Sequence, residues 1–314
     1  MDLIAEYLAT TPLRAKALVL DGALATELEA RGADLRDPLW SAKVLLEDPG
    51  MIRAVHREYL DAGADIVTTA TYQASFAGFA RRGLDSAAAA RLMQSAVTLA
   101  CEARDEFWAE PANRAGRLRP LVAASIGPYG AVLADGSEYH GHYALDDAAL
   151  RDFHAPRLEL LARAGADLLA IETLPCLREA RVLAQLVGEL AALPAWIAFA
   201  CADRALTCEG QDIGDCAAAL QAAPLIAAVG VNCTAPGLMV PLLQRMQARA
   251  ALPLLVYPNS GEGYDADTKC WKGTPDPQRF AAAALQWRAA GARLIGGCCR
   301  TNPADIRALR AALA

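Results

Sequence analysis

The sequence contains no long apolar run and no cluster of basic residues. A membrane-spanning helix needs about 20 consecutive apolar residues, and no such stretch is present. The first residues carry neither a basic segment nor a long apolar core, so we predict a cytoplasmic protein without a secretory leader. With a net charge of −6 and no lysine-rich or arginine-rich segment, we expect neither a nucleic-acid nor a membrane partner.

The nine cysteines lack the regular spacing of a disulfide framework, and their number is odd. Reduced thiols together with a metal site explain them better than bridges do in a cytoplasmic protein. Cys101, Cys201 and Cys216 lie in apolar or helical runs, and we interpret them as small buried hydrophobic residues.

Charged residues make up only 21% of the chain, against 54% hydrophobic residues. This composition supplies a large core and argues against disorder. A chain of 314 residues could hold two domains, but α/β barrels often fill this length with one. No linker or low-complexity segment is present, and we predict one domain over residues 1–314.

Short apolar runs alternate with longer amphipathic segments along the chain. Eight runs have the nearly continuous apolar character of parallel strands buried on both faces. They cover residues 17–20, 65–68, 121–125, 167–171, 195–200, 226–231, 253–257 and 293–295. Amphipathic helices are predicted at 51–62, 86–107, 146–164, 177–190, 238–250, 276–290 and 303–313.

Eight strand–helix units predict a (β/α)8 TIM barrel in a single domain. A doubly wound open sheet is the alternative. It is weakened because no Gly-x-Gly-x-x-Gly follows the first predicted strand. In a barrel, the active site lies at the carboxyl ends of the strands. Polar residues follow seven of the predicted strands there: Asp21 and Gly22, Thr69 and Tyr72, Tyr129, Glu172, Asn232 and Cys233, Glu262, and Cys298 and Cys299.

Three cysteines in that set, Cys233, Cys298 and Cys299, predict a metal site with one open coordination position. Thiolates favour Zn²⁺, and Gly296 and Gly297 permit the sharp turn that two adjacent ligands need. A thiol bound as the fourth ligand loses its proton and stays nucleophilic, which favours alkyl transfer to a thiol. A structural zinc or a redox pair is the alternative. However, structural zinc normally has four protein ligands, and a disulfide between neighbouring cysteines is strained.

Two carboxylates, Asp21 and Glu172, are predicted on the same rim and could bind the ammonium of an amino-acid substrate. Backbone N–H groups near Gly22 could then bind its carboxylate. The alternatives are a turn-forming role for Asp21 and a structural ion pair for Glu172. His140 and His142 lie in the loop after the third strand, but a metal site there is the weaker interpretation.

Several motifs together resemble the homocysteine S-methyltransferases, in particular the stand-alone bacterial type that uses S-methylmethionine. The matching segments are Leu20-Asp21-Gly22-Ala23-Leu24-Ala25-Thr26-Glu27, Leu39-Trp40-Ser41-Ala42, Gly127-Pro128-Tyr129-Gly130-Ala131, Gly136-Ser137-Glu138-Tyr139, Ile171-Glu172-Thr173-Leu174-Pro175, Gly230-Val231-Asn232-Cys233, Tyr257-Pro258-Asn259-Ser260-Gly261-Glu262 and Gly296-Gly297-Cys298-Cys299-Arg300-Thr301. They extend from about residue 20 to the C-terminus. Two departures are Ala23, where wider members often have glycine, and the segment 202–212.

The resemblance implies a zinc-bearing (β/α)8 barrel whose metal ligands match Cys233, Cys298 and Cys299. It implies that homocysteine is bound by groups matching Asp21, Gly22 and Glu172, with Thr69 nearby. Asn232, next to Cys233, is a further substrate-binding candidate. For the methyl donor, a sulfonium cation favours aromatic faces and carboxylates. The candidates are Trp40, Tyr72, Tyr129 and Glu262.

The expected reaction is zinc-dependent methyl transfer from S-methylmethionine, with S-adenosylmethionine as a weaker donor, to the thiol of L-homocysteine, which gives methionine. Betaine as donor, or another thiol as acceptor, is the alternative with the same chemistry. A non-catalytic zinc- or thiol-binding protein would explain the cysteines but not the polar rim. A zinc hydrolase would need histidine or carboxylate ligands and a general base beside the water. The sequence leaves the oligomeric state open.

Overall fold

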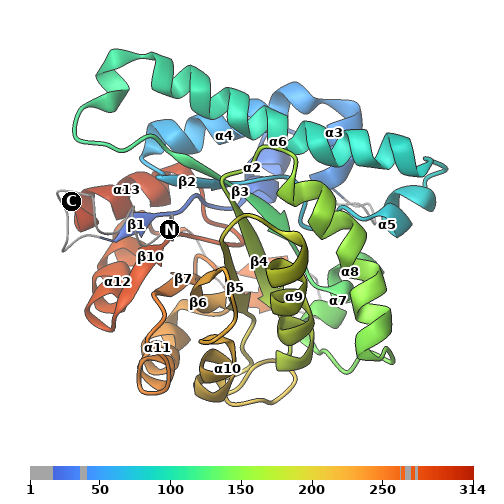
Figure 1. The fold of residues 1–314 in the computed structure, drawn as a ribbon. Helices are drawn as coiled ribbons and strands as arrows, with labels where there is room; N and C mark the ends of the chain where they lie inside the picture. Colours follow the sequence, from blue (N-terminus) through green and yellow to red (C-terminus); the bar gives the residue numbers. More distant parts are fainter. Residues whose placement is uncertain (1–16, 36–40, 262, 266–269, 273–274) are drawn as a thin grey trace.

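A computed structural model describes residues 17–35, 41–261, 263–265, 270–272 and 275–314. Eight parallel strands form a barrel that is surrounded by helices (Figure 1). In their order around the barrel, the strands are β1 (Leu18–Val19), β10 (Ala292–Ile295), β7 (Leu254–Tyr257), β6 (Ile226–Asn232), β5 (Ala195–Phe199), β4 (Leu168–Leu174), β3 (Leu121–Ile126) and β2 (Ile66–Thr68).

Backbone pairing between β1 and β2 closes the barrel. Leu20 forms a parallel bridge with Ile66, and the N–H of Asp21 donates to the carbonyl of Ile66 at 3.0 Å. The N–H of Asp65 donates to the carbonyl of Val19 at 2.7 Å. The predicted (β/α)8 barrel is therefore confirmed. The alternative of an open sheet is wrong because both edge strands are paired.

The continuous apolar runs are explained by two cores on opposite faces of the barrel wall. One core fills the barrel and includes Trp196, Leu255 and Leu294, and the larger one lies between the strands and the helices. Strands buried on both faces read as apolar at every position. At Gly230 of β6 a Cβ atom would lie 1.8 Å from the carbonyl oxygen of Leu255, so this wall position accepts only glycine.

The longer helices lie where the sequence predicts them, and α9 and α13 have the predicted bounds. The α-helices are α2 (Leu24–Ala30), α3 (Ser41–Glu47), α4 (Pro49–Ala62), α5 (Phe76–Ala80), α6 (Ser86–Ala109), α7 (Tyr129–Leu133), α8 (Asp147–Ala162), α9 (Leu177–Leu190), α10 (Ile213–Leu220), α11 (Met239–Gln247), α12 (Pro277–Ala289) and α13 (Pro303–Leu313). None of the helices in the described ranges is long and apolar enough to span a membrane.

The sequence prediction missed α10, the short helices α2, α3, α5 and α7, and the hairpin of β8 (Gly263–Asp265) and β9 (Cys270–Lys272). Helix α10 has eight residues, too few for a clear amphipathic period. Its start is fixed by a cap, because the side chain of Asp212 accepts hydrogen bonds from the N–H groups of Gly214 and Asp215.

Two loops meet at the carboxyl end of the barrel. One follows β3 and contains α7 and the 3₁₀ turn η2 (Ser137–Tyr139). The other is the segment 202–212 after β5. Glu209 from this segment accepts a hydrogen bond from the N–H of His142 at 2.6 Å. The segment 202–212 thus supports the loop after β3.

Candidate active site

A cavity of about 430 Å³ opens at the carboxyl ends of the strands. Its described wall contains three carboxylates, Asp21, Glu138 and Glu172. It also contains three thiols, those of Cys233, Cys298 and Cys299. No lysine, arginine or histidine belongs to this part of the wall. The cavity is therefore electronegative and favours cations.

The three predicted thiols converge at the cavity floor. Their Sγ atoms all lie within 4.8 Å of one another, and those of Cys233 and Cys299 are 3.4 Å apart. Backbone hydrogen bonds tie both segments to the end of β7, since the N–H of Cys298 donates to the carbonyl of Pro258 at 2.7 Å and that of Cys233 to the carbonyl of Tyr257 at 3.2 Å. A cluster of three sulfur ligands from two barrel strands fits a soft metal ion with a position left open.

The glycines before the vicinal cysteines are required for space, not for a left-handed turn. Gly296 and Gly297 do not have positive φ angles. A Cβ atom at Gly297 would lie 2.3 Å from Oγ1 of Thr301, and one at Gly296 would lie 2.5 Å from Cβ of Leu20. The positive φ angles near the cluster belong instead to Cys233, at +47°, and to Arg300, at +68°.

The electrostatics of the cluster also fit a metal ion. Hydrogen bonds from Cys233 and Cys298 lower the pKa of Cys299 below its usual value. The pKa of Cys298 is raised by its hydrogen bonds to Cys233 and Cys299 and by burial. A thiolate at one cysteine therefore makes ionisation of its neighbours unfavourable, because a second thiolate would lie beside the first. A cation is needed to hold all three sulfurs as thiolates.

Asp21 is buried at the end of β1, with 5% of its surface exposed. Its carboxylate accepts hydrogen bonds from the N–H of Thr68 at 2.7 Å and from the Thr68 hydroxyl at 3.1 Å. Burial nevertheless raises the pKa of Asp21 to about 8, and the charge of Glu172 adds to this rise. Because burial makes the ionised carboxylate unfavourable, a cation bound beside it would stabilise its charged form.

Gly22 continues the cavity wall after Asp21. A Cβ atom here would lie 2.9 Å from the ring of Tyr59 and from Oγ1 of Thr301, so a side chain would displace packed atoms. Among the described residues, none accepts a hydrogen bond from the Gly22 N–H. This backbone donor is suited to an anionic group of a ligand.

Glu172 lies at the end of β4 with 9% of its surface exposed. It accepts hydrogen bonds from the hydroxyl of Ser125 and from Tyr257. Tyr257 is fixed in turn by the indole N–H of Trp196 at 3.1 Å. Burial raises the pKa of Glu172 to about 7 despite these bonds. Glu172 is thus a positioned carboxylate without a basic partner in the described wall.

Thr69 and Tyr72 line the cavity after β2. The Thr69 hydroxyl lies 2.7 Å from that of Thr71 and accepts a hydrogen bond from the N–H of Ser125. Burial raises the pKa of Tyr72, so its phenol stays neutral. Its ring packs against Gly127, where a Cβ atom would lie 2.7 Å from a ring carbon. Tyr72 thus contributes a neutral aromatic residue to the wall.

Two other predicted residues do not belong to the described cavity wall. The side chain of Asn232 accepts a hydrogen bond from the N–H of Thr173 and donates one to its hydroxyl, both at 2.8 Å. It stabilises Thr173, which has a left-handed φ of +61° beside Glu172. The ring of Tyr129 packs edge-on against Tyr143, away from the cavity.

The predicted donor residues Trp40 and Glu262 lie outside the described residues. Sequence reasoning missed Thr68, Ser125, Tyr257, Glu138 and Tyr139 as parts of the cavity wall. The first three lie on predicted strands, where their polar side chains were the available signal. Glu138 and Tyr139 belong to the matching segment Gly136-Ser137-Glu138-Tyr139, which the sequence alone linked to no function.

Tyr139 lies on η2, with 41% of its surface exposed. Its hydroxyl is 2.9 Å from Sγ of Cys233, within hydrogen-bond distance. This contact links the loop after β3 to the thiol cluster. Thiols and two carboxylates on strand ends thus share the cavity wall with a tyrosine and a third carboxylate from the loop after β3.

Comparisons with known proteins agree with this geometry. The sequence profile of the homocysteine S-methyltransferase family matches residues 18–313. The homocysteine S-methyltransferase YbgG of Bacillus subtilis (strain 168) is 49% identical over 311 residues, which cover 99% of this chain and 98% of the relative. The homocysteine S-methyltransferase of Escherichia coli (strain K12) is 52% identical over 295 residues, 94% of each chain.

A solved structure shows the same similarity to homocysteine methyltransferases. The crystal structure of the homocysteine methyltransferase MmuM from Escherichia coli, in its metallated form, matches with a TM-score of 0.85 and 49% identity. The match covers 94% of this chain and 96% of that chain. Sequence and structure agree over nearly the full length, and the chain belongs to the homocysteine S-methyltransferase family.

Proposed function

We propose that the protein transfers a methyl group from S-methylmethionine to the thiol of L-homocysteine, giving methionine, and that residues 1–314 act as one domain. The observation that carries this proposal is the cavity wall, where three carboxylates and three thiols meet without a basic side chain in its described part. Such a wall is suited to a metal ion, an ammonium group and a cationic methyl donor.

Cys233, Cys298 and Cys299 would hold the metal, which we propose to be zinc because thiolates favour it. When bound, zinc supplies a Lewis acid that lowers the pKa of a substrate thiol and keeps the sulfur nucleophilic. The metallated form of the Escherichia coli relative supports a metal in this family.

The carboxylates of Glu172 and Asp21 bind the ammonium of homocysteine, and the N–H of Gly22 binds its carboxylate. Ionised carboxylates and N–H donors are the usual partners of these two groups. Ser125 and Tyr257 fix Glu172, and Thr68 fixes Asp21, so the substrate is oriented by groups that are themselves held. Orientation of the sulfur against the methyl carbon is the main contribution of these residues.

The reaction itself needs no general base at the methyl carbon, because no proton leaves it. The thiolate sulfur of homocysteine donates its electron pair to the methyl carbon. The bond from that carbon to the donor sulfur breaks, and its electrons stay on the donor sulfur. The cationic sulfonium becomes a neutral thioether, so one methionine forms from each substrate. Loss of the positive charge weakens the attraction of the product to the electronegative wall and favours its release.

A test is methionine formation from homocysteine by zinc-loaded protein, with S-methylmethionine, S-adenosylmethionine and betaine supplied as parallel donors. We expect the highest kcat/KM with S-methylmethionine, and loss of turnover after chelation that returns when zinc is added back. Turnover with betaine but not with S-methylmethionine would contradict the assignment of S-methylmethionine as the donor. Full turnover in metal-free protein would contradict the role of the thiol cluster.

A further inference from the structure

One carboxylate in the cavity wall has no established partner. Glu138 lies on η2, in the loop after β3, and lines the cavity. Its Oε2 atom is buried and has no hydrogen-bond partner within the described part of the chain. The carboxylate is hydrogen-bonded to the backbone of Glu138 itself. A buried carboxylate oxygen without a donor is costly, which indicates that a ligand supplies the donor.

The other two carboxylates of the wall differ from Glu138 in this respect. Asp21 accepts hydrogen bonds from Thr68, and Glu172 accepts them from Ser125 and Tyr257. Both lie on strand ends, whereas Glu138 lies on the loop after β3. The proposed function assigns the two strand-end carboxylates to homocysteine, which leaves Glu138 for the second substrate.

The loop holds Glu138 in a defined position. A Cβ atom at Gly130 would lie 2.6 Å from the backbone N of Glu138, so α7 and η2 are in direct contact. Asp135 accepts a hydrogen bond from the N–H of Ser137 at 3.0 Å, and the neighbouring Tyr139 hydroxyl lies against Cys233. The position of the Glu138 carboxylate is therefore tied to the thiol cluster.

We propose that Glu138 is the specificity-determining residue for the methyl donor and binds its ammonium group. This inference rests on the proposed function. An ammonium group offers three N–H donors, whereas a sulfonium centre offers none, so only the ammonium can satisfy the unpartnered oxygen. Donors with an α-ammonium group are then selected over sulfonium compounds that lack it.

The test uses the Glu138→Gln variant of the zinc-loaded full-length protein, because glutamine has nearly the same shape without the charge. We expect the KM for S-methylmethionine to rise about 10- to 100-fold, since a charge-assisted hydrogen bond is lost. The KM for homocysteine and the zinc content should stay within about twofold. Glu138→Asp, which keeps the charge on a shorter side chain, should recover part of the loss.

The matched control is Glu209→Gln, at the same end of the barrel. Glu209 accepts the hydrogen bond from the N–H of His142, which glutamine can also accept. This variant removes a negative charge outside the cavity wall and keeps the acceptor for His142, while it loses the hydrogen bond from the side chain of Gln211. Its donor KM should stay within about twofold of the wild-type value. A rise equal to that of Glu138→Gln would show a general charge effect and overturn the proposal.

A second donor separates ammonium recognition from sulfonium recognition. 3-(Dimethylsulfonio)propionate has a sulfonium and a carboxylate but no ammonium. With this donor, Glu138→Gln should change kcat/KM by less than about twofold, whereas an equal loss with both donors would overturn the assignment. A rise in the KM for homocysteine alone would also overturn it. Wild-type protein that does not turn over S-methylmethionine would instead contradict the proposed function itself.

Discussion

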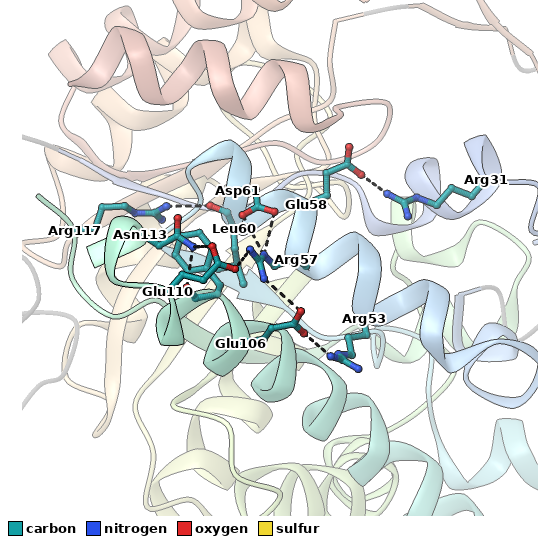
Figure 2. Close-up of polar contacts among 11 residues, drawn as sticks. Arg31, Arg53, Arg57, Glu58, Leu60, Asp61, Glu106, Glu110, Asn113 and Arg117 are labelled. Atoms are coloured by element: carbon teal, nitrogen blue, oxygen red, sulfur yellow. Dashed lines mark hydrogen bonds and ion pairs between the residues drawn. The ribbon is translucent and has the colours of Figure 1, made fainter. Parts of the chain in front are cut away.

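The α4–α6 surface and the cavity wall are both rich in charge, but they arrange it differently. On the surface, Figure 2 shows Arg53 and Arg57 of α4 facing Glu106 of α6 and Glu110, which directly follows α6. Each of these carboxylates has an arginine partner and is about half exposed to solvent. In the described cavity wall, no basic residue accompanies the three carboxylates.

The pKa values follow this difference. The hydrogen bond from Arg53 lowers the pKa of Glu106, whereas burial raises the pKa of Asp21 to about 8 and that of Glu172 to about 7. A paired surface carboxylate is satisfied by the protein itself. A buried carboxylate without a cation is unfavourable until a ligand brings one. Carboxylates without a basic partner, rather than charge as such, therefore mark the site.

The largest effect is expected at the thiols. Cys298→Ala removes one of the three proposed metal ligands. It should lower zinc affinity at least about 100-fold and abolish methyl transfer, since even residues that only support a ligand contribute 10- to 100-fold. Metal content after dialysis and turnover in a buffer with a weak chelator measure both effects. Cys101→Ser, outside the cavity, is the control and should keep metal and activity. A Cys298→Ala variant that retains one zinc would contradict the assignment.

The next effect concerns an unpaired carboxylate. Glu172→Ala should raise the KM for homocysteine about 30-fold or more, because removing one partner of a buried charge pair costs roughly 2–5 kcal/mol. The zinc content should not change. Steady-state kinetics at saturating donor, together with metal analysis, give both values. If metal and substrate affinity fell together, Glu172 would be a scaffold residue and not a binding residue.

Asp21 gives a smaller effect, on stability. The pKa of Asp21 is about 8 in the folded protein, against 3.8 for an unperturbed aspartate in the unfolded chain, so the folded state binds the proton more tightly. The stability that this provides is present at pH 4 and is lost as the pH rises towards 8. The unfolding temperature of metal-free protein should therefore fall by several degrees between pH 5 and 8, and the fall should be smaller in Asp21→Asn.

A paired carboxylate serves as the control with the opposite sign. Asp105 is partly buried, which raises its pKa, but hydrogen bonds from Arg104 and Arg119 lower the pKa below the usual value. Its contribution to stability is present above pH 4 and is lost only below it. Asp105→Asn should leave the slope between pH 5 and 8 unchanged. Equal slopes for wild type and Asp21→Asn would show that Asp21 does not hold its proton as described.

The smallest effect is expected on the α4–α6 surface. Arg57→Met removes contacts with Asp61, Glu106 and Glu110 at once. Exposed ion pairs contribute little, so the unfolding temperature should fall by less than about 4 °C. Both KM values should stay at the wild-type level. A large kinetic effect would break the distinction between the two regions, because these charges would then act on the site.

The barrel could be predicted from the sequence because its strands are buried on both faces. Such strands are apolar at nearly every position, and this pattern marked all eight of them. The positions of the three cysteines at strand ends followed directly. Short helices such as α10 could not be predicted in the same way, because eight residues give too few turns for a clear period.

The wall residues from the loop after β3 were harder to predict than those on strand ends. Strand ends converge by topology, so Asp21 and Glu172 could be placed together. Glu138 and Tyr139 reach the cavity only through the folding of a long loop, and no periodic pattern encodes that. Tyr129 follows a strand end as the floor residues do, yet its ring packs against Tyr143. Position after a strand does not fix the direction of a side chain.

The central claim is that each unpaired carboxylate binds a ligand cation. A crystal structure of the zinc-loaded protein with homocysteine and methionine, the demethylated form of the proposed donor, tests it most directly. We expect the homocysteine ammonium within hydrogen-bond distance of Glu172 or Asp21, and the methionine ammonium at Glu138. Both amino acids bound with their ammonium groups in solvent, and the carboxylates still without cations, would contradict the account.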